Sequence, residues 1–335
     1  MLLTPQQARI AFQDALEKKY AILAINADSP AAITDCLYAA QEASAPIIIE
    51  ASLWQLTGRS FGAGDALTGM ARYLAQISAL ANAPQFQKLP VLFHTDHIKG
   101  PGTRELLTAA IQGIPFEASG NKIPLFASSI SVDSSELTEA QNIQLLCDLC
   151  NAANTSGVEV TLEMEAGVDD GLTPLDVADR LLGGVEKKYP GNIWLWAPGV
   201  GTRHGFSEQG FPAFSSEHIA NHRERAREIT GREIGIALHG SSGLAPEALH
   251  AAVEAGVVKV NWSSESLLVR AQAAQAYYQE AGHKLDPAHP QFKISAMDNG
   301  VQSYVTERYI PKILERFDSL GCRDRAENLM LRILA

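Results

Sequence analysis

The chain has 335 residues, of which 46% are hydrophobic, so it can bury a large core as either one large α/β barrel or two ordinary domains. Its formal net charge of -11 argues against a nucleic-acid or anionic-membrane partner, because no surplus of basic residues is present to neutralise phosphates. The first residues lack the apolar segment of a secretory signal, and no stretch approaches the roughly 18 apolar residues that span a bilayer. We therefore expect a cytoplasmic protein with a small-molecule ligand.

Short apolar runs alternate with longer amphipathic stretches along the whole chain, which is typical of repeated βα units and a parallel sheet. These runs predict strands at 21–26, 46–52, 90–97, 123–130, 158–165, 192–199, 234–240 and 257–262. Eight βα units are the number that closes a (β/α)8 TIM barrel. Because no Gly/Ser-rich linker or change of composition divides the chain, we expect a single domain over residues 1–335.

The helices between these strands have recognisable boundary signals. Ser29 and Pro30 predict the start of the first interstrand helix, and Gly256 the end of the one before the last strand. After the last strand, three further helices are expected to cover the outside of the barrel as a C-terminal extension, at 265–281, 301–317 and 323–334.

The main structural alternative is a doubly wound open sheet. That fold predicts a Gly-rich phosphate-binding turn after the first strand, whereas Asn26 is followed here by Ala27-Asp28-Ser29.

The four cysteines predict reduced thiols rather than a disulfide framework in a chain of this length. Cys147 and Cys150 form a CxxC pair within a predicted helix at 136–157, where their spacing places them on one apolar face. A zinc site would need a second ligand pair nearby in the sequence. We expect them to be core thiols.

Potentially reactive side chains gather at the predicted strand ends, which surround the mouth of a parallel barrel. They are His94, Asp96 and His97 on strand three, Glu163 and Glu165 on strand five, His204 in the loop after strand six, and His239 at the end of strand seven. The period of two places His94 with Asp96 on one face, and Glu163 with Glu165 on one face, while His97 turns out at the rim. This gives imidazoles and carboxylates a shared cavity.

Three of these histidines, His97, His204 and His239, could form a metal site. Neutral imidazoles bind Zn²⁺, and three protein ligands with an open fourth position define a catalytic zinc site. A single histidine near a strand end is more often a hydrogen-bonded core or rim residue than a ligand. The metal reading is favoured because the three follow different strands at one mouth.

An anion could bind beside this site. Gly205, Gly240, Ser242 and the turn at 261–264 would offer backbone N–H groups and small hydroxyls, which bind phosphate without a cation. A plain βα turn with a helix cap accounts equally well for the Gly-Ser-Ser-Gly stretch at 240–243.

The motifs, in their order along nearly the whole chain, resemble those of the class II fructose-bisphosphate aldolases and their tagatose-bisphosphate relatives. The matching stretches are AILAINAD, PIIIEAS, VLFHTDH, PLFASSISVDSSELTEAQNI, TLEMEAG, APGVGTRHG, LHGSSGL and KVNWSSES. The HTDH element and the LHGSSG turn together are fairly specific, whereas GTRHG alone would be a weak signal.

The resemblance implies a zinc-dependent lyase of carbohydrate metabolism, a homodimer or higher homo-oligomer. It would reversibly cleave a ketose phosphate into a dihydroxyacetone-phosphate-type ketone and an aldehyde. One catalytic Zn²⁺ is implied, with a second metal or a monovalent cation as a further option. No Schiff-base lysine is needed in such chemistry, and only Lys99 and Lys259 lie near strand ends.

The resemblance also implies roles for individual residues. It makes Asp96 the general acid/base on the hydroxyl at the cleaved bond, and Glu165 and Asp133 alternate or outer metal carboxylates. The implied zinc ligands are His97, His204 and His239. The implied substrate-binding and phosphate-binding residues are Asn26, Ser52, Gly205, Gly240, Ser242, Asn261, Ser263 and Ser264.

The chain departs from the family pattern in three places. The last strand, usually Asn, apolar, Asp, Thr, Asp, has Ser263 in place of its first aspartate. The loop at 166–171 leaves Asp170 or Asp169 as the second acid/base. The stretch LWQLTGRSFGAG after strand two brings Trp54, Gln55 and Arg59 to where a different distal group would bind. We therefore expect an aldolase for a fructose-bisphosphate-like ketose phosphate, and these departures leave a variant sugar substrate as an alternative.

Two rival functions fit part of the pattern. A metal-dependent barrel hydrolase usually needs a close histidine pair on its first strand, and AILAINADS has none. A non-catalytic barrel that binds sugar phosphates would not need Asp96 beside three histidines.

Overall fold

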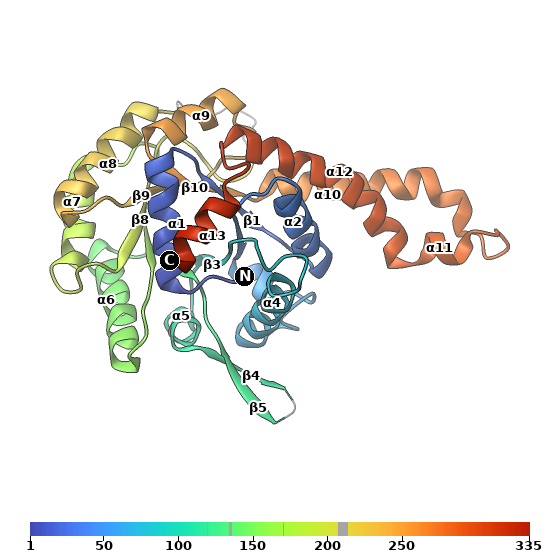
Figure 1. The fold of residues 1–335 in the computed structure, drawn as a ribbon, viewed down its shortest axis with the longest axis horizontal. Coiled ribbons are helices and arrows are strands. Elements are labelled where there is room, and N and C mark those ends of the chain that lie inside the picture. The colour runs from blue at the N-terminus through green and yellow to red at the C-terminus, as the bar shows by residue number, and fades with distance from the viewer. Residues whose placement is uncertain (119, 134–135, 170, 207–213) are drawn as a thin grey trace.

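Eight parallel strands close on themselves into a barrel (Figure 1) in a computed structural model that describes residues 1–118, 120–133, 136–169, 171–206 and 214–335. The barrel strands are β1 (Ile22–Asn26), β2 (Ile47–Ala51), β3 (Val91–Ile98), β6 (Ser129–Val132), β7 (Leu162–Ala166), β8 (Ile193–Pro198), β9 (Gly235–Leu238) and β10 (Val257–Trp262). Each pairs with the next along the chain, and β10 pairs with β1. The predicted (β/α)8 barrel is confirmed, and the open doubly wound sheet is excluded.

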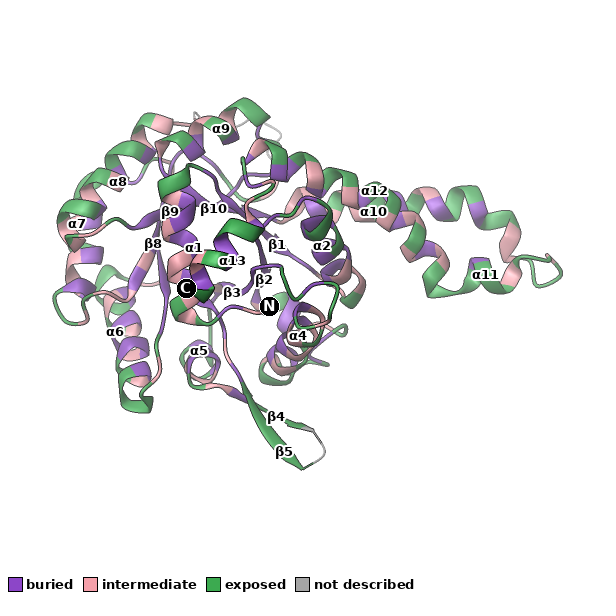
Figure 2. Cartoon of the chain, viewed as in Figure 1, coloured by how far each residue is buried: buried purple, intermediate pink, exposed green. Residues whose placement is uncertain are grey.

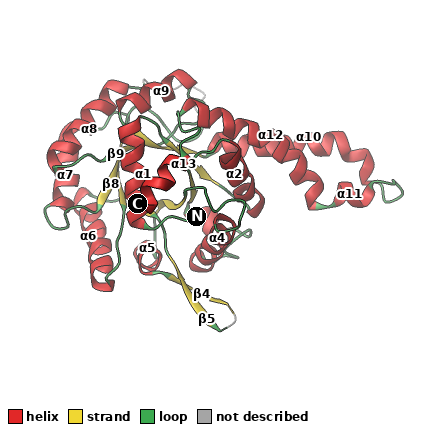
Figure 3. Cartoon of the chain, in the orientation of Figure 1, coloured by secondary structure: helices red, strands yellow, loops and turns green. Residues whose placement is uncertain are grey.

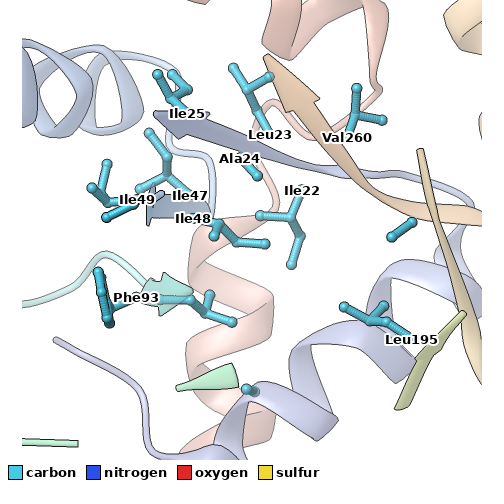
Figure 4. Close-up of a cluster of buried hydrophobic side chains, with 14 of the residues drawn as sticks. Ile22, Leu23, Ala24, Ile25, Ile47, Ile48, Ile49, Phe93, Leu195 and Val260 are labelled. Carbon is cyan, nitrogen blue, oxygen red and sulfur yellow. The ribbon is translucent and has the colours of Figure 1, made fainter. Parts of the chain in front are cut away.

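The barrel strands are buried on both faces, which is why most of their residues are apolar. The isoleucines of β1 and β2 are fully buried, as are Phe93 of β3 and Leu195 of β8. Figure 4 shows these side chains packed together across neighbouring strands. Removing this surface from water drives closure of the barrel.

Helices surround the strands (Figure 3). Those between the strands are α2 (Pro30–Glu42), α3 (Leu53–Thr57), α4 (Ala66–Ala81), α5 (Thr103–Gln112), α6 (Glu139–Ser156), α7 (Leu175–Glu186), α8 (Ser216–Thr230) and α9 (Pro246–Ala255). The predicted boundary signals are confirmed: Ser29 Oγ accepts a hydrogen bond from the Ala32 amide at the start of α2, and Gly256 ends α9 with a φ of 117°. No helix in the described part of the chain has the length and apolar character needed to cross a membrane.

One end of the barrel is closed by the chain termini. Helix α1 (Pro5–Lys18) packs against β9 and β10, and the last helix, α13 (Ala326–Leu334), packs on α1. The Leu3 amide donates a 2.8 Å hydrogen bond to the Val91 carbonyl at the start of β3. The opposite end, where the carboxyl ends of the strands and the loops that follow them lie, stays open and can form a binding site.

The fourth barrel strand was placed wrongly from the sequence. The predicted strand at 123–130 is divided: β5 (Asn121–Leu125) pairs antiparallel with β4 (Ile114–Ala118), and only β6 belongs to the barrel. The apolar run at 123–125 finds a partner close in sequence, in a hairpin that projects from the barrel and is largely exposed (Figure 2).

The C-terminal helices exist as predicted, but only part of them covers the barrel. They are α10 (Ser264–Ala281), η1 (Gly282–Leu285), α11 (Phe292–Ala296), α12 (Asp298–Ser319) and α13. Helix α12 packs against α2 and α9, and α10 and α12 pack along each other. Together with α11 they form an arm that extends away from the barrel (Figure 1). Helices α10 and α12 bury part of their apolar surface against each other, so this part does not have to be covered by the barrel.

The cysteines are buried and unpaired. Cys147 and Cys150 lie within α6 on its buried side, which confirms the expected core thiols.

A buried histidine of α8, in contact with Trp196 of β8, predicts a pH dependence of stability. Trp196 Nε1 donates to His222 Nδ1 at 3.2 Å, and His222 Nε2 lies 2.8 Å from the Thr173 carbonyl. The indole can only donate, so protonation of Nδ1 would break this contact. Burial lowers the pKa of His222 to about 4, so the folded chain favours the neutral ring.

We expect the free energy of unfolding to fall as the pH is lowered from 6.5 to about 4, because the unfolded chain then binds a proton that the folded chain rejects. The contribution of His222 is at most about 3 kcal/mol, is complete above pH 6.5, and is lost progressively below it. Urea titrations of the metal-free protein across this range would measure it. His222→Gln should flatten the slope, and His250→Gln, at an exposed histidine, should not. Equal slopes in all three proteins would contradict the prediction.

Candidate metal and catalytic site

A cavity of about 660 Å³ opens where the barrel strands end. The predicted site residues that line it are Asn26, Ser52, Asp96, His97, Asp133, Glu165, His204, Gly205, Gly240, Ser242, Asn261, Ser263 and Ser264. His239 joins them through a hydrogen bond to His97. Asp170, predicted as the second acid/base, lies outside the described residues.

Three imidazole nitrogens converge at this mouth. His97 Nε2 lies 2.8 Å from His204 Nε2 and 2.8 Å from His239 Nδ1. These ligand atoms all lie within 4.8 Å of one another. Three imidazole nitrogens that face one common point from the ends of different strands form, once neutral, the donor set that zinc prefers in catalytic sites.

The second nitrogen of each of these rings faces a carboxylate. His97 Nδ1 lies 3.1 Å from Glu165 Oε2, His204 Nδ1 lies 2.8 Å from Asp169 Oδ2, and His239 Nε2 lies 2.7 Å from Glu163 Oε1. When the ring nitrogen that faces the carboxylate carries the proton, the other ring nitrogen, which faces the neighbouring histidines, is left unprotonated and free to bind a metal. The residues present therefore fit a zinc ion, with Glu165 able to serve as a metal carboxylate or as the partner of His97.

A local distortion of β3 brings Asp96 and His97 into the same cavity. Consecutive residues of a regular strand point to opposite faces, so one of the two would otherwise face away. His97 has a φ of 49°, and the pairing of β3 with β6 shifts register between Thr95 and Ile98. A left-handed backbone at a residue other than glycine is strained, and such strain is concentrated at functional sites.

Asp96 is buried and held by three donors. Its Oδ2 accepts from Asn26 Nδ2 at 2.9 Å and from Ser52 Oγ at 3.0 Å, and its Oδ1 accepts from Asn261 Nδ2 at 2.9 Å. Burial alone would raise the pKa of Asp96, but the positive charges of His97 and Lys259 and these hydrogen bonds hold it well below its usual value. The carboxylate is therefore ionised and able to accept a proton from substrate.

A buried polar layer lies beneath the mouth; we predicted Glu163 at a strand end and noted Lys259 near one, but did not predict Glu50 or the contacts among the three. Lys259 Nζ is 3.1 Å from Glu163 Oε2, 3.4 Å from Glu50 Oε2 and 2.6 Å from Asn261 Oδ1, and all four residues are buried. Burial alone would lower the pKa of Lys259, but Glu163 and Glu50 raise it, so the amine stays charged.

His94 belongs to the same lower layer. It shares a face with Asp96, as expected, but its Nδ1 lies 2.7 Å from Ser129 Oγ and burial lowers the pKa of His94 to about 3. It is thus a neutral core histidine, distinct from the three at the mouth. A signal for this layer was present in the sequence: Glu50, His94, Glu163 and Lys259 each stand two positions before a residue at the mouth.

Small residues line the part of the cavity where the sequence predicted anion binding. Gly240 has a φ of 64°, and a Cβ there would lie 2.5 Å from the Arg203 carbonyl oxygen, so no other residue fits. Ser242 Oγ accepts a hydrogen bond from the Glu265 amide at 3.1 Å, which ties this turn to the start of α10. Ser263 and Ser264 line the cavity beside it.

Asp133 lines the same cavity, and although burial alone would lower the pKa of His97, the charge of Asp133 contributes to raising it. Lys99 Nζ lies 3.2 Å from Asp133 Oδ2, and among the described residues the clusters that could hold a metal are His97, His204, His239 and Glu163, Glu165, His239. Asp133 therefore lines the cavity as the partner of Lys99.

Comparisons with known proteins agree with this geometry. A family model described as fructose-bisphosphate aldolase class-II matches residues 6–321. A fructose-bisphosphate aldolase of Ureaplasma parvum is 27% identical over 280 residues, covering 82% of this chain and 84% of its own length. One from Saccharomyces cerevisiae is 28% identical over 281 residues, covering 76% and 75%.

Solved structures share the fold. The crystal structure of fructose-bisphosphate aldolase from Campylobacter jejuni has a TM-score of 0.79 at 19% identity and covers 96% of each chain. The YdjI aldolase from Escherichia coli K12 has a TM-score of 0.69 at 20% identity and covers 98% of this chain and 100% of its own. On the family match, the chain belongs to the class II fructose-bisphosphate aldolases, a family of lyases that is generally zinc-dependent.

Proposed function

We propose that this protein is a zinc-dependent aldolase that reversibly cleaves a ketose phosphate into a dihydroxyacetone-phosphate-type ketone and an aldehyde. The observation that carries the proposal is the arrangement of three imidazoles, each with its outer nitrogen on a carboxylate, beside the ionised and buried Asp96. We further propose that residues 1–335 act as a single domain in a cytoplasmic homodimer or higher oligomer.

The histidines at 97, 204 and 239 would hold the zinc. When bound, the metal would supply an electrophile that stabilises negative charge on the ketone oxygen during cleavage. Asn261 donates one amide hydrogen to Asp96 while its oxygen accepts from Lys259, so the chain fixes the orientation of that amide.

Asp96 would accept the proton of the hydroxyl on the carbon that becomes the aldehyde. As this proton leaves, the hydroxyl oxygen forms the new carbonyl, and the carbon–carbon bond breaks with its electron pair moving into the ketone half. The resulting enediolate takes up a proton from a second acid to give the ketone product. In the direction of synthesis Asp96 returns its proton to the new hydroxyl.

We propose Asp170 as this second acid. Asp169 accepts hydrogen bonds from the His204 amide and from His204 Nδ1, both at 2.8 Å. The hydrogen bond from His204 lowers the pKa of Asp169 to about 2, so Asp169 stays ionised and serves to hold the histidine.

The phosphate of the ketone half would lie against Gly205, Gly240, Ser242, Ser263 and Ser264. The support is that all five line the cavity, and that Gly240 and the start of α10 bring a glycine turn and a helix start to it, which can present N–H groups and hydroxyls.

The test is aldol cleavage of a panel of ketose 1-phosphates and ketose bisphosphates before and after chelation. We expect cleavage to disappear with the chelator and return with zinc. Zinc bound tightly with no cleavage of any ketose, and no aldol addition of dihydroxyacetone phosphate to any aldehyde, would refute the proposal.

Glu163→Gln should weaken zinc binding about 10–100-fold, because the ionised partner of His239 is replaced by a neutral amide. Competition with a chromogenic chelator measures the zinc dissociation constant directly. Glu233→Gln, at an exposed surface glutamate that pairs with Arg223, is the matched control and should leave zinc binding unchanged. Unchanged affinity in both variants would show that the Glu163 contact does not support the metal site.

A further inference from the structure

We propose that the aldehyde half of the substrate carries no phosphate, so that the substrate is a ketose with one phosphate, on its ketone half, and an uncharged distal end lying against Leu53, Trp54 and Thr57. This inference rests on the proposed function and deepens it by naming the substrate class.

The aldehyde half is placed by Asp96. In the proposed reaction Asp96 acts on the hydroxyl of that half, and Ser52, the residue just before α3, donates to Asp96 Oδ2 at 3.0 Å. Helix α3 follows directly and lines the cavity with Leu53, Trp54 and Thr57. The distal end of the aldehyde half therefore meets α3.

The surface that α3 offers is largely apolar. Trp54 is 50% exposed, which leaves an open indole face next to the reacting groups. Thr57 Oγ1 donates to the Leu53 carbonyl at 2.9 Å, so its hydroxyl is engaged within the helix. Carbon chains with hydroxyl groups pack well on such a surface, whereas a phosphate dianion would lose hydration there without gaining donors.

Most polar groups at the start of α3 already make hydrogen bonds within the chain. Gln55 Oε1 accepts from the Ser52 amide at 2.7 Å and from Asn26 Nδ2 at 3.3 Å, so the capping interactions are already made within the chain. Asn26 Nδ2 is also used by Ser52 and Asp96. Asn26 Oδ1, a buried acceptor, and Gln55 Nε2, a buried donor, have no hydrogen-bond partner among the described residues, and neither atom is exposed to the cavity.

The charges that line the cavity also disfavour a second phosphate. Among the described residues that line the cavity, Lys99 is the only lysine or arginine, and its Nζ lies 3.2 Å from Asp133 and 3.3 Å from Glu136. Neither lysine nor arginine occurs among residues 119, 134–135, 170 and 207–213. The carboxylates that line the same cavity are Asp96, Asp133, Glu165 and Asp169. A second phosphate would face this negative charge, while the first would lie against the N–H groups of the glycine and serine turns.

The experiment compares aldehydes in the direction of synthesis, with zinc-loaded enzyme and dihydroxyacetone phosphate as donor. We expect kcat/KM for glyceraldehyde to exceed that for glyceraldehyde 3-phosphate by about tenfold or more. A preference for the phosphorylated aldehyde would overturn the inference, and would also be the result if a second copy of the chain supplied a cation.

A gain-of-charge variant tests the placement on α3. Trp54→Arg should raise the ratio of kcat/KM for glyceraldehyde 3-phosphate over glyceraldehyde by about tenfold, because a guanidinium then faces the distal phosphate. Leu331→Arg adds the same charge on exposed α13 at the closed end of the barrel and should leave the ratio unchanged. Thr57→Lys is a second variant with the same expected direction as Trp54→Arg. An unchanged ratio in both α3 variants would overturn the placement.

Exchange of the carbon-bound hydrogen of dihydroxyacetone phosphate with D₂O distinguishes failure of the proposed function from failure of the single-phosphate proposal. This exchange needs the metal site and the ketone half but no aldehyde. If it is absent from zinc-loaded enzyme, the proposed function fails, and this inference fails with it. If it is present and the phosphorylated aldehyde is preferred, only the single-phosphate inference fails.

Discussion

An Asp96→Asn enzyme is expected to keep its zinc and to cleave its ketose about 10²–10⁴-fold more slowly than the wild type, because the base that takes the hydroxyl proton is gone. The shape of the site should survive. Asn261 cannot turn its amide, since Lys259 holds its oxygen, but Asn26 can, since its own oxygen has no partner in the described structure. An asparagine at 96 can therefore accept from Asn261 and donate to a turned Asn26.

Two measurements distinguish loss of the base from damage to the site. Zinc content should remain that of the wild type, and exchange of the carbon-bound hydrogen of dihydroxyacetone phosphate should persist, since Asp96 acts only on the aldehyde half. Ser52→Ala, which removes one donor and leaves the carboxylate, should cost at least about tenfold less than Asp96→Asn. Cleavage by Asp96→Asn at the wild-type rate would remove Asp96 from the mechanism.

Most of the fold could be predicted because strands that are buried on both faces are rich in apolar residues, a pattern that is visible in the sequence. Strands such as β2 and β10 are covered by helices outside and by the barrel core inside, so they appear as mostly apolar runs, interrupted by Glu50 in β2 and by Lys259 and Asn261 in β10. The hairpin of β4 and β5 was missed because its apolar residues pair locally and stay partly exposed, as at Ile123. Periodicity alone cannot tell such a run from a barrel strand.

The mouth of the site could be predicted for a similar reason: the residues follow strands, and strand ends meet at one face of a barrel. The carboxylate partner of each histidine could not be predicted, because each pair joins side chains from different strands or loops. Glu163 on β7 reaches His239 after β9, and Asp169 reaches His204, and neither pairing is encoded by spacing along the chain.

The largest expected effect on stability comes from the buried lysine beneath the mouth. Lys259→Met should lower the free energy of unfolding by about 3–5 kcal/mol, because it leaves the buried Glu163 carboxylate without its counter-charge. Burial alone would raise the pKa of Glu163, but Lys259 and the neighbouring histidines hold it below its usual value, so Glu163 is ionised in the folded chain. For Glu50, burial and the charge of Asp96 raise the pKa well above its usual value, which favours the neutral acid.

The double variant Lys259→Met with Glu163→Gln tests whether this pair accounts for the loss. Removing both charges leaves no ionised group unpaired at this contact, so the double variant should be less destabilised than the sum of the two single variants, with a coupling of about 1–3 kcal/mol. Urea unfolding of the metal-free proteins at neutral pH measures all three. Strict additivity would show that Lys259 and Glu163 do not stabilise each other. Since Lys259 also holds the oxygen of Asn261, any double variant that regains stability should still be impaired in cleavage, because the amide that donates to Asp96 is then free to turn.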